Sequence, residues 1–288
     1  MNYQSYHNVY YQPDKNPVFC YRSGLAVREE TLLNGVLVSS GHNAAGYPLN
    51  VLSGFPSRLS INDFAEPSAF NIEIDGQSID FRLDFVDFEI NESENSTESI
   101  LNLKSRIKPV ELKIHTVLDG TQMLTRFIEI KNISEKSICL SRLCVLSGGI
   151  ETMERKQFTE NNNIDELYSV GYFSNDQWAR EGEFAWRKLN PDTLSVDCRF
   201  GRDRFRHPLI FIRNNVKGTI YFAQTAWSGG CRFSVDYNAT SERDKSTLAF
   251  KAEITSHKPI TVIPAGETFI SPEVHFGIIH GDLDDAVN

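Results

Sequence analysis

Two alternating runs of apolar and polar residues, joined by Asp119-Gly120, are the feature that most constrains the fold of this chain. The first run covers residues 110–118 and the second covers residues 122–130. Alternation with a period of two sends successive side chains to opposite faces of a β-strand, so each run predicts a strand with one apolar face. An Asp-Gly dipeptide between two such runs is typical of a tight β-hairpin. The sequence therefore predicts an antiparallel strand pair at this point.

The same pattern recurs along most of the chain. Further alternating or apolar runs lie at 70–74, 81–90, 138–146, 209–212, 219–226, 248–254 and 260–263. The polar segment 91–99 is predicted to be a loop, and no helical periodicity of ordinary length precedes residue 282. Many short strands that each have one apolar face predict an all-β fold, a large antiparallel β-sandwich. Because no linker, exact repeat or low-complexity stretch interrupts the pattern, we expect one extended sandwich rather than two domains.

Composition and charge exclude several classes of protein. The 288 residues are 40% hydrophobic and carry a net charge of −9, which argues against nucleic-acid binding because phosphate contacts need a clustered basic surface. No stretch approaches the roughly 18 apolar residues of a membrane span, and the first residues lack the basic and apolar regions of a secretory signal. We therefore expect a cytoplasmic protein without a membrane partner. The five cysteines are scattered and form no Cys-x-x-Cys pair, so we predict reduced thiols, no metal and no cofactor.

A series of short motifs fills the second half of the chain. They are Gln177-Trp178-Ala179-Arg180-Glu181, Arg199-Phe200-Gly201-Arg202, His207-Pro208, Trp227-Ser228-Gly229-Gly230 and Pro264-Ala265-Gly266-Glu267, which runs on to Pro272-Glu273. In this order, the motifs resemble the N-terminal domain of glycoside hydrolase family 36, the melibiase-like α-galactosidases. An upstream strand with Arg126 and Asn132 fits the same resemblance. There are two departures: Gly230 stands where the family usually has Asn, and residues 203–205 replace a common Ser-Ser turn.

The resemblance implies a β-supersandwich of the galactose-mutarotase-like kind over residues 1–281, followed by a (β/α)8 catalytic barrel. Residues 282–288 would begin the helix that links the two, with Asp282 as its N-cap. In the family, two catalytic aspartates of a retaining mechanism lie in the barrel. Because a barrel needs about 200 residues or more, neither aspartate is placed on this chain. The implied parent enzyme hydrolyses terminal α-galactosides in oligosaccharides, and we expect this chain alone to be inactive.

The resemblance also implies partners and a non-catalytic role. The partners are the chain's own C-terminal barrel, further copies in a homo-oligomer of the full-length enzyme and, indirectly, a galactosyl oligosaccharide. Tryptophan rings stack on the C–H faces of sugars, and arginine N–H groups hold sugar hydroxyls. We therefore predict a substrate rim, with no catalytic residue in it, made of Trp178, Arg180, Arg202, His207 and Trp227. Cation–π packing between neighbouring Trp and Arg residues stays an alternative explanation.

Two other functions stay open. One is a freestanding carbohydrate-binding module, and the other is a mutarotase-like sugar epimerase. The epimerase would need a histidine acid and a carboxylate base facing one sugar. His207, His257 and His275, with Glu273, supply those residue types. Surface or structural histidines explain the same residues more simply.

Direct glycoside hydrolysis by this chain has weaker support in the sequence. A retaining hydrolase needs two carboxyl groups about 5–5.5 Å apart. The candidate pairs are Glu181 with Glu183 and Glu267 with Glu273. Solvent-facing carboxylates are the simpler interpretation of both pairs. Pro264-Ala265-Gly266 is typical of a turn, and Glu267 comes directly after it.

Overall fold

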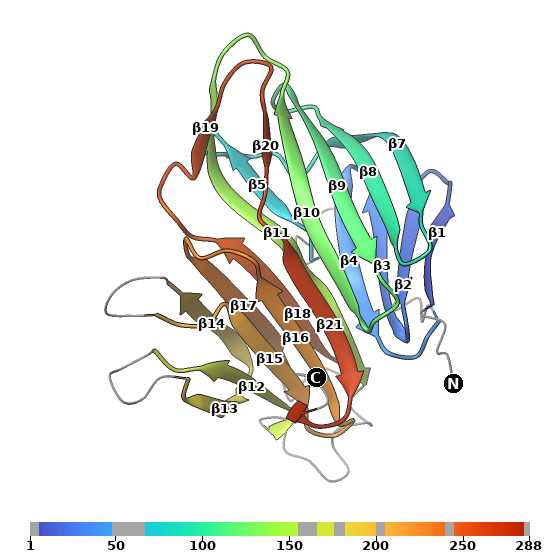
Figure 1. Cartoon of the computed structure of the whole chain (residues 1–288), viewed down its shortest axis with the longest axis vertical. Helices are drawn as coiled ribbons and strands as arrows, with labels where there is room; N and C mark the ends of the chain where they lie inside the picture. Colours follow the sequence, from blue (N-terminus) through green and yellow to red (C-terminus); the bar gives the residue numbers. More distant parts are fainter. Residues whose placement is uncertain are drawn as a thin grey trace.

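The computed structural model of the chain contains three antiparallel β-sheets arranged in two layers (Figure 1). It describes residues 6–47, 67–154, 166–175, 182–199, 205–239 and 245–284. A ten-stranded sheet forms one layer, and a four-stranded and a seven-stranded sheet lie side by side in the other. Strands dominate the described residues, which confirms the predicted all-β antiparallel sandwich.

The strands have the following spatial order and bounds. The ten-stranded sheet consists of β13 (Phe184–Leu189), β12 (Tyr168–Phe173), β15 (Leu209–Asn214), β16 (Thr219–Thr225), β21 (Val274–His280), β10 (Met123–Asn132), β9 (Val110–Leu118), β8 (Thr97–Ser105) and β7 (Leu83–Glu92), with β20 (Thr268–Ile270) paired to β10. The seven-stranded sheet consists of β14 (Asp192–Cys198), β17 (Cys231–Asn238), β18 (Lys245–Ile254), β11 (Ile138–Glu154), β5 (Asn71–Ile74) and β6 (Gln77–Ser78), with β19 (Thr261–Ile263) paired to β11. The four-stranded sheet consists of β1 (His7–Gln12), β2 (Val18–Ser23), β3 (Ala26–Leu33) and β4 (Val36–Asn43).

The hairpin predicted around Asp119-Gly120 is confirmed. Strands β9 and β10 pair along its whole length, from Leu118 opposite Leu124 to Val110 opposite Asn132. The Asp-Gly dipeptide at 75–76 also makes a tight turn, with φ of 52° and 74° at its two residues. Positive φ at both central positions is the geometry of a type I′ turn, which matches the twist of the strands it joins. That turn joins β5 to the short β6, whereas the alternating run that follows becomes β7 in the other layer.

The predicted loop at 91–99 is wrong at both ends. Strand β7 continues to Glu92 and β8 starts at Thr97, which leaves only a four-residue turn at 93–96 between them. Thr97 and Ser99 are polar but buried. Because both faces of β8 begin with polar side chains, the alternation of hydrophobicity that reveals a strand is missing there.

The four-stranded sheet has no counterpart among the predictions from sequence. At the centre of β3 stand Arg28, Glu29 and Glu30, all of which are buried. A run of three charged residues hides the apolar pattern of the strand. The turn between β3 and β4 is Asn34-Gly35, with φ of 51° and 83°, so this dipeptide was an available hairpin signal.

A buried ion cluster joins the three sheets. Arg28 and Glu30 share one face of β3, and the Nε of Arg28 donates to the Glu30 carboxylate at 2.8 Å. Arg126 of β10 donates to the same carboxylate through Nη2 at 3.0 Å and also through Nη1. Arg28 donates in addition to the backbone oxygen of Ser147 in β11, at 2.6 Å. Burial alone would raise the pKa of Glu30, but the two arginines outweigh it and hold that pKa below its usual value.

The C-terminal part of the described chain turns into a helix at residues 283–284. The backbone N–H of Asp284 donates to the side chain of Asp282 at 2.9 Å, which is the contact expected of an N-cap. This agrees with the predicted helix start, and residues 285–288 lie outside the described residues. Within the described ranges, there is no helix with the length and apolarity that a membrane crossing requires.

Candidate functional site

Several strands of both layers end at one end of the sandwich. In the ten-stranded sheet, Tyr172 lies opposite Ile210, and Leu209 lies opposite Gln224. In the seven-stranded sheet, Cys231 is the partner of both Cys198 and Ile254. The connections that leave these strand ends contain the motifs singled out in the sequence. We call this end of the molecule the loop end.

The predicted rim residues are only in part described. Trp178, Arg180 and Arg202 lie outside the described residues. His207 and Trp227 are described, and both lie in connections at the loop end, after β14 and after β16 respectively. Their role as a rim stays a prediction.

His207 packs between aromatic rings. Its ring centroid lies 4.8 Å from that of Phe173 and 4.8 Å from that of Phe205, both edge-on. Its neighbour Arg206 lies over the ring of Tyr172 and donates to the backbone oxygen of Asp197 at 2.9 Å. These contacts tie the connection between β14 and β15 to both layers of the sandwich.

Trp227 lies on the β16–β17 connection and is 41% exposed. Its indole covers Gly229 so closely that a Cβ on that glycine would come within 2.5 Å of the ring. Gly230 has φ of +114°, a conformation that side-chain-bearing residues rarely adopt. The departure from the usual family Asn at this position therefore coincides with a backbone that suits glycine.

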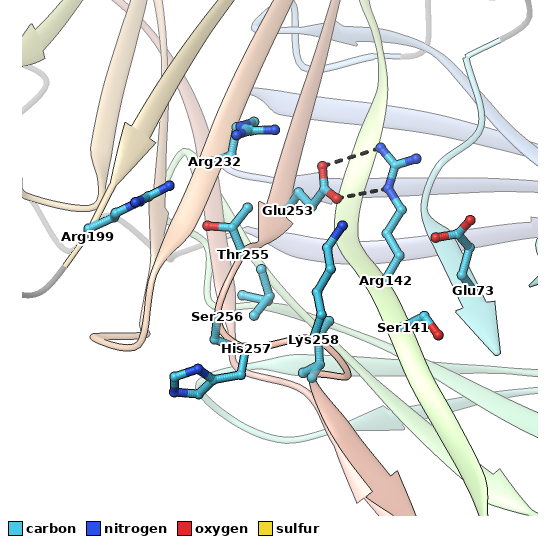
Figure 2. A pocket seen from close by; sticks show the side chains of 12 residues that line it. Glu73, Ser141, Arg142, Arg199, Arg232, Glu253, Thr255, Ser256, His257 and Lys258 are labelled. Carbon is cyan, nitrogen blue, oxygen red and sulfur yellow. Dashed lines mark hydrogen bonds and ion pairs between the residues drawn. The ribbon is translucent and has the colours of Figure 1, made fainter. Parts of the chain in front are cut away.

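A polar pocket of about 420 Å³ lies on the outer face of the seven-stranded sheet and reaches the loop end (Figure 2). Arg142 of β11, Arg232 of β17 and Glu253 of β18 form its floor, and Glu73 of β5 lies at one side. The segment that follows β18 supplies Thr255, Ser256, His257 and Lys258. The lining contains four cationic side chains (Arg199 is the fourth) and two carboxylates, and Asp197, the ion-pair partner of Arg232, adds a third carboxylate, so these side chains together have a net charge of +1 without His257.

Ion pairs hold two of the pocket arginines in place. Arg142 donates to both carboxylate oxygens of Glu253, at 2.8 and 3.3 Å. Arg232 donates in the same way to Asp197, at 2.6 and 3.3 Å. The hydrogen bond from Arg232 is the main reason why the pKa of Asp197 lies below its usual value. Both pairs are partly exposed, so they fix the geometry of the pocket more than they stabilise the fold.

The sequence did not single out this pocket. Its charged floor residues, Arg142, Arg232 and Glu253, come from three strands that pair only through long-range register. In the sequence each is an ordinary polar residue on the outward face of an alternating strand. No local pattern distinguishes them from the other solvent-facing charges.

The candidate carboxylate pairs do not form a hydrolytic centre in the described residues. The positions of Glu267 and Glu273 can be compared along β10, with which the residues that follow them pair. Thr268, after Glu267, pairs with Lys131, and Val274, after Glu273, pairs with Arg126. Lys131 and Arg126 are five positions apart on one extended strand, which is about 17 Å at 3.3–3.4 Å per residue. A retaining hydrolase needs about 5–5.5 Å. Of the other pair, Glu181 lies outside the described residues.

The turn at 264–267 has the structural role expected of it. Gly266 has φ of +77°, and the backbone N–H of Glu267 donates to the Pro264 oxygen at 3.2 Å. The Asn132 side chain donates to the backbone oxygens of Ile263 and Pro264, at 3.1 and 3.0 Å. The prediction of a turn is therefore confirmed.

The three histidines considered for an epimerase do not converge. His275 points outward from the ten-stranded sheet, where it meets Thr125 at 2.8 Å and Glu273 at 3.8 Å. His257 lines the pocket on the opposite outer face, and two packed sheets lie about 10 Å apart. His207 stands at the loop end between its two phenylalanines. Of the three, His275 makes a side-chain contact with Glu273.

A second apolar cluster covers part of the outer face of the ten-stranded sheet. We call it the aromatic face, and it consists of Phe184, Trp186, Leu209, Phe211, Ile220, Phe222, Ile279 and Leu283. The Phe184 ring lies edge-on to both Trp186 and Phe211, with centroids 5.5 and 5.8 Å apart. Leu283, in the helix start, packs against this cluster. The described chain therefore ends on an apolar surface outside the main core.

Among the described residues, no group of three or more His, Cys, Asp or Glu is placed to hold a metal ion. No protein-family model and no curated protein sequence matches the chain.

Solved structures do match it. The galactosidase domain of the α-galactosidase–sucrose kinase AgaSK aligns with a TM-score of 0.69 at 15% identity, over 95% of this chain and 42% of that one. The family 36 α-galactosidase AgaB from Geobacillus stearothermophilus aligns with 0.68 at 17% identity, over 96% and 42%. The α-galactosidase from Lactobacillus brevis aligns with 0.68 at 14% identity, over 95% and 41%. The chain thus has the fold of a domain that makes up about two fifths of family 36 α-galactosidases, which confirms at the level of fold the resemblance noted in the sequence.

Proposed function

We propose that this chain is the non-catalytic β-sandwich domain of a family 36-like α-galactosidase, an enzyme that removes terminal α-galactosyl groups from oligosaccharides. The observation that carries the proposal is the extent of the structural match. Nearly the whole of this chain aligns, but with only about two fifths of each α-galactosidase chain. In this view, the carboxylates that break the glycosidic bond belong to a catalytic barrel that the aligned region does not include.

The positions of the carboxylates support this division of labour. Glu267 and Glu273 are too far apart along β10 to act as nucleophile and acid/base on one glycosidic bond. Glu253, the acidic residue in the pocket floor, is held by Arg142 through two hydrogen bonds. These two hydrogen bonds give the Glu253 carboxylate a structural role in the pocket floor.

The aromatic face supports a docking role. Phe184, Trp186 and Phe222 remain partly exposed around the buried Phe211. Grouped apolar side chains on an outer face are typical of a surface that a further domain or subunit covers. Because Leu283 already packs there, the linker helix would run over this face, and the barrel would cover what remains of it.

The loop end is the natural place for a contribution to the substrate site. The connections that carry Trp178, Arg180, Arg202, His207 and Trp227 leave strands that end there. We propose that these residues border the barrel's active site, or that of a neighbouring subunit in a homo-oligomer, and help to enclose a galactosyl oligosaccharide. One of the matched structures is a complex with raffinose of a variant of AgaA from Geobacillus stearothermophilus that carries two substitutions.

Two experiments test the proposal. The purified chain, incubated with a nitrophenyl α-galactoside, should release no nitrophenol above buffer. Turnover that Glu181→Gln or Glu267→Gln abolishes would overturn the non-catalytic assignment. The gene provides the second test, because a reading frame that continues for a further ~200 residues or more is long enough for a barrel. A stop codon directly after Asn288 would count against the proposal.

The two rival functions give different results on the same protein. A freestanding sugar-binding module should show saturable heat in calorimetric titration with galactose, melibiose or raffinose. A mutarotase-like enzyme should accelerate the change of optical rotation of fresh α-D-galactose. We expect neither, because His275 and Glu273, which lie close together, are on the outer face of the ten-stranded sheet and are not among the residues that line the described pocket.

A further inference from the structure

The pocket in Figure 2 is positively charged in an acidic protein. The chain as a whole has a net charge of −9, yet the pocket lining carries four cations and two carboxylates, or three carboxylates when Asp197, the partner of Arg232, is counted. A concave site with an excess of one sign of charge focuses its field and attracts ligands of the opposite sign. The local excess of positive charge therefore favours an anionic ligand.

Two of the four cations make no ion pair within the described residues. Arg142 and Arg232 are held by Glu253 and Asp197. Arg199 and Lys258 form no salt bridge in the part of the chain that the structure describes, although Arg199 is near enough to Asp197 to help lower the pKa of that carboxyl. Figure 2 shows the Lys258 side chain extended towards the Arg142–Glu253 pair, with Arg199 on the other side of the pocket. These two side chains are available to an incoming anion.

The pocket also contains groups that recognise hydroxyls. The Glu73 carboxylate makes no hydrogen bond within the described residues, and it lies beside Arg142 in register across β5 and β11. Ser256 also lines the pocket, whereas the Ser141 hydroxyl already bonds the backbone of Gly76 and Cys139. A guanidinium group has five N–H donors. Arg142 uses two of them to bond Glu253, so its other donors remain for a ligand. Among the lining residues that the structure describes there is no Phe, Tyr or Trp, so recognition here is mainly polar.

We propose that this pocket binds a small anion that carries several hydroxyl groups, of the sugar phosphate class. Arg199 and Lys258 hold the phosphate group, and Glu73, with the donors of Arg142, holds the hydroxyls. The volume of about 420 Å³ falls within the range of small-molecule sites and suits a phosphorylated monosaccharide. The inference uses only the pocket residues and does not rest on the proposed function.

Calorimetric titration of the purified chain with galactose 6-phosphate tests the proposal. We expect saturable binding of galactose 6-phosphate, with a higher affinity than for inorganic phosphate. Neutral galactose should not saturate the site up to ~1 mM. The affinity for galactose 6-phosphate should fall as the salt concentration is raised, because salt screens charge interactions. Lys258→Met and Arg199→Met should each weaken binding about tenfold, as loss of one charge-assisted hydrogen bond predicts. Because neither residue has an ion pair among the described residues, both variants should keep the fold.

The control is Lys104→Met, which removes an exposed lysine on the outer face of the other layer and should leave binding unchanged. Glu73→Ala should strengthen binding of inorganic phosphate and reduce the preference for the sugar phosphate. Equal affinity for inorganic phosphate and the sugar phosphate would overturn the assignment of hydroxyl recognition. Absence of saturation with any anion, or unchanged affinity in Lys258→Met and Arg199→Met, would overturn the site itself.

Discussion

Replacing Glu30 by Gln should destabilise the sandwich more than any other single carboxylate-to-amide change in the described chain. Glu30 is fully buried and accepts hydrogen bonds from two buried arginines, Arg28 and Arg126. Through them it connects β3 with β10, and Arg28 extends the link to Ser147 of β11. The amide keeps the shape of the side chain but removes its charge. Two buried guanidinium groups are then left without a counter-ion.

The expected loss follows from the burial of the cluster. Removing one partner of a buried ion pair costs about 3–5 kcal/mol, because the remaining charge stays desolvated. Here two cations share one carboxylate, so we expect a loss of about 5 kcal/mol in the free energy of unfolding. For a chain of this size, that corresponds to a fall in Tm of roughly 10 °C or more. Urea unfolding followed by tryptophan fluorescence, with scanning calorimetry, measures both quantities.

The pH dependence provides a second readout. The pKa of Glu30 is held below its usual value, so the folded carboxylate binds its proton less readily than the unfolded one. Its contribution to stability is therefore complete above the ordinary Glu pKa, about 4.3, and is lost as the pH falls through the lower folded value. Glu30→Gln should lack this part of the acid destabilisation.

The matched control is Asp84→Asn, the same chemical change at a carboxylate that pairs with Arg106 on the surface. An exposed pair contributes little, so the control should unfold like the parent protein. If Glu30→Gln unfolded within ~1 kcal/mol of the parent, the buried cluster would not be holding the sheets together as argued. Replacing Arg28, Glu30 and Arg126 together by apolar residues should recover part of the loss, since no buried charge then remains.

Three further predictions concern other parts of the fold. His42→Phe should leave stability equal or raise it by about 1 kcal/mol, because neither ring nitrogen of His42 has a hydrogen-bond partner in the described structure. Burial and Arg28 lower the pKa of His42, so the parent should lose stability below pH ~6.5 as the unfolded chain takes up a proton, and the variant should not show this loss. Gly277→Ala should lower the free energy of unfolding by about 1–3 kcal/mol, because the new Cβ would lie 2.2 Å from the ring of Phe222. Adding Phe222→Leu to this variant should restore part of the lost stability, and purely additive effects of the two substitutions would contradict the contact. Ellman's reagent should titrate Cys139 first in the native protein, since the other four cysteines are buried, and fast reaction of a second thiol would refute that burial.

The sequence was sufficient for the fold class because its strongest signals are local. The hairpin of β9 and β10 needs only its own alternation and the Asp119-Gly120 turn between the strands. Strand β3 fails the same test because Arg28 and Glu30 occupy core positions. Their partner Arg126 lies 96 residues further along the chain from Glu30, so nothing local announces that these charges are paired and buried.

The Arg126–Asn132 motif illustrates the limit of reading function from a resemblance. Arg126 binds Glu30 in the core, and Asn132 donates to the backbone around Pro264. Both ends of the motif are occupied by the packing of this domain. In this chain, the motif therefore serves the packing of the domain, and it points to no substrate contact.

The loop end and the pocket differ in how far the sequence determines them. In an antiparallel sheet successive strands reverse direction, so every second connection falls at the same end. The motifs around Trp178, Arg202 and Trp227 occupy the connections after β12, β14 and β16. Because these are alternate connections, the order of the strands alone predicts that the strand ends beside the three motifs lie at one end of the sandwich. The pocket depends instead on how three strands pair. Glu253 of β18 lies opposite Arg232 of β17 on one side and opposite Cys144 of β11 on the other, and no single residue specifies this register. A ligand site built from cross-strand register becomes visible only in three dimensions, and for this reason the titration of the pocket tests something that the family resemblance did not imply.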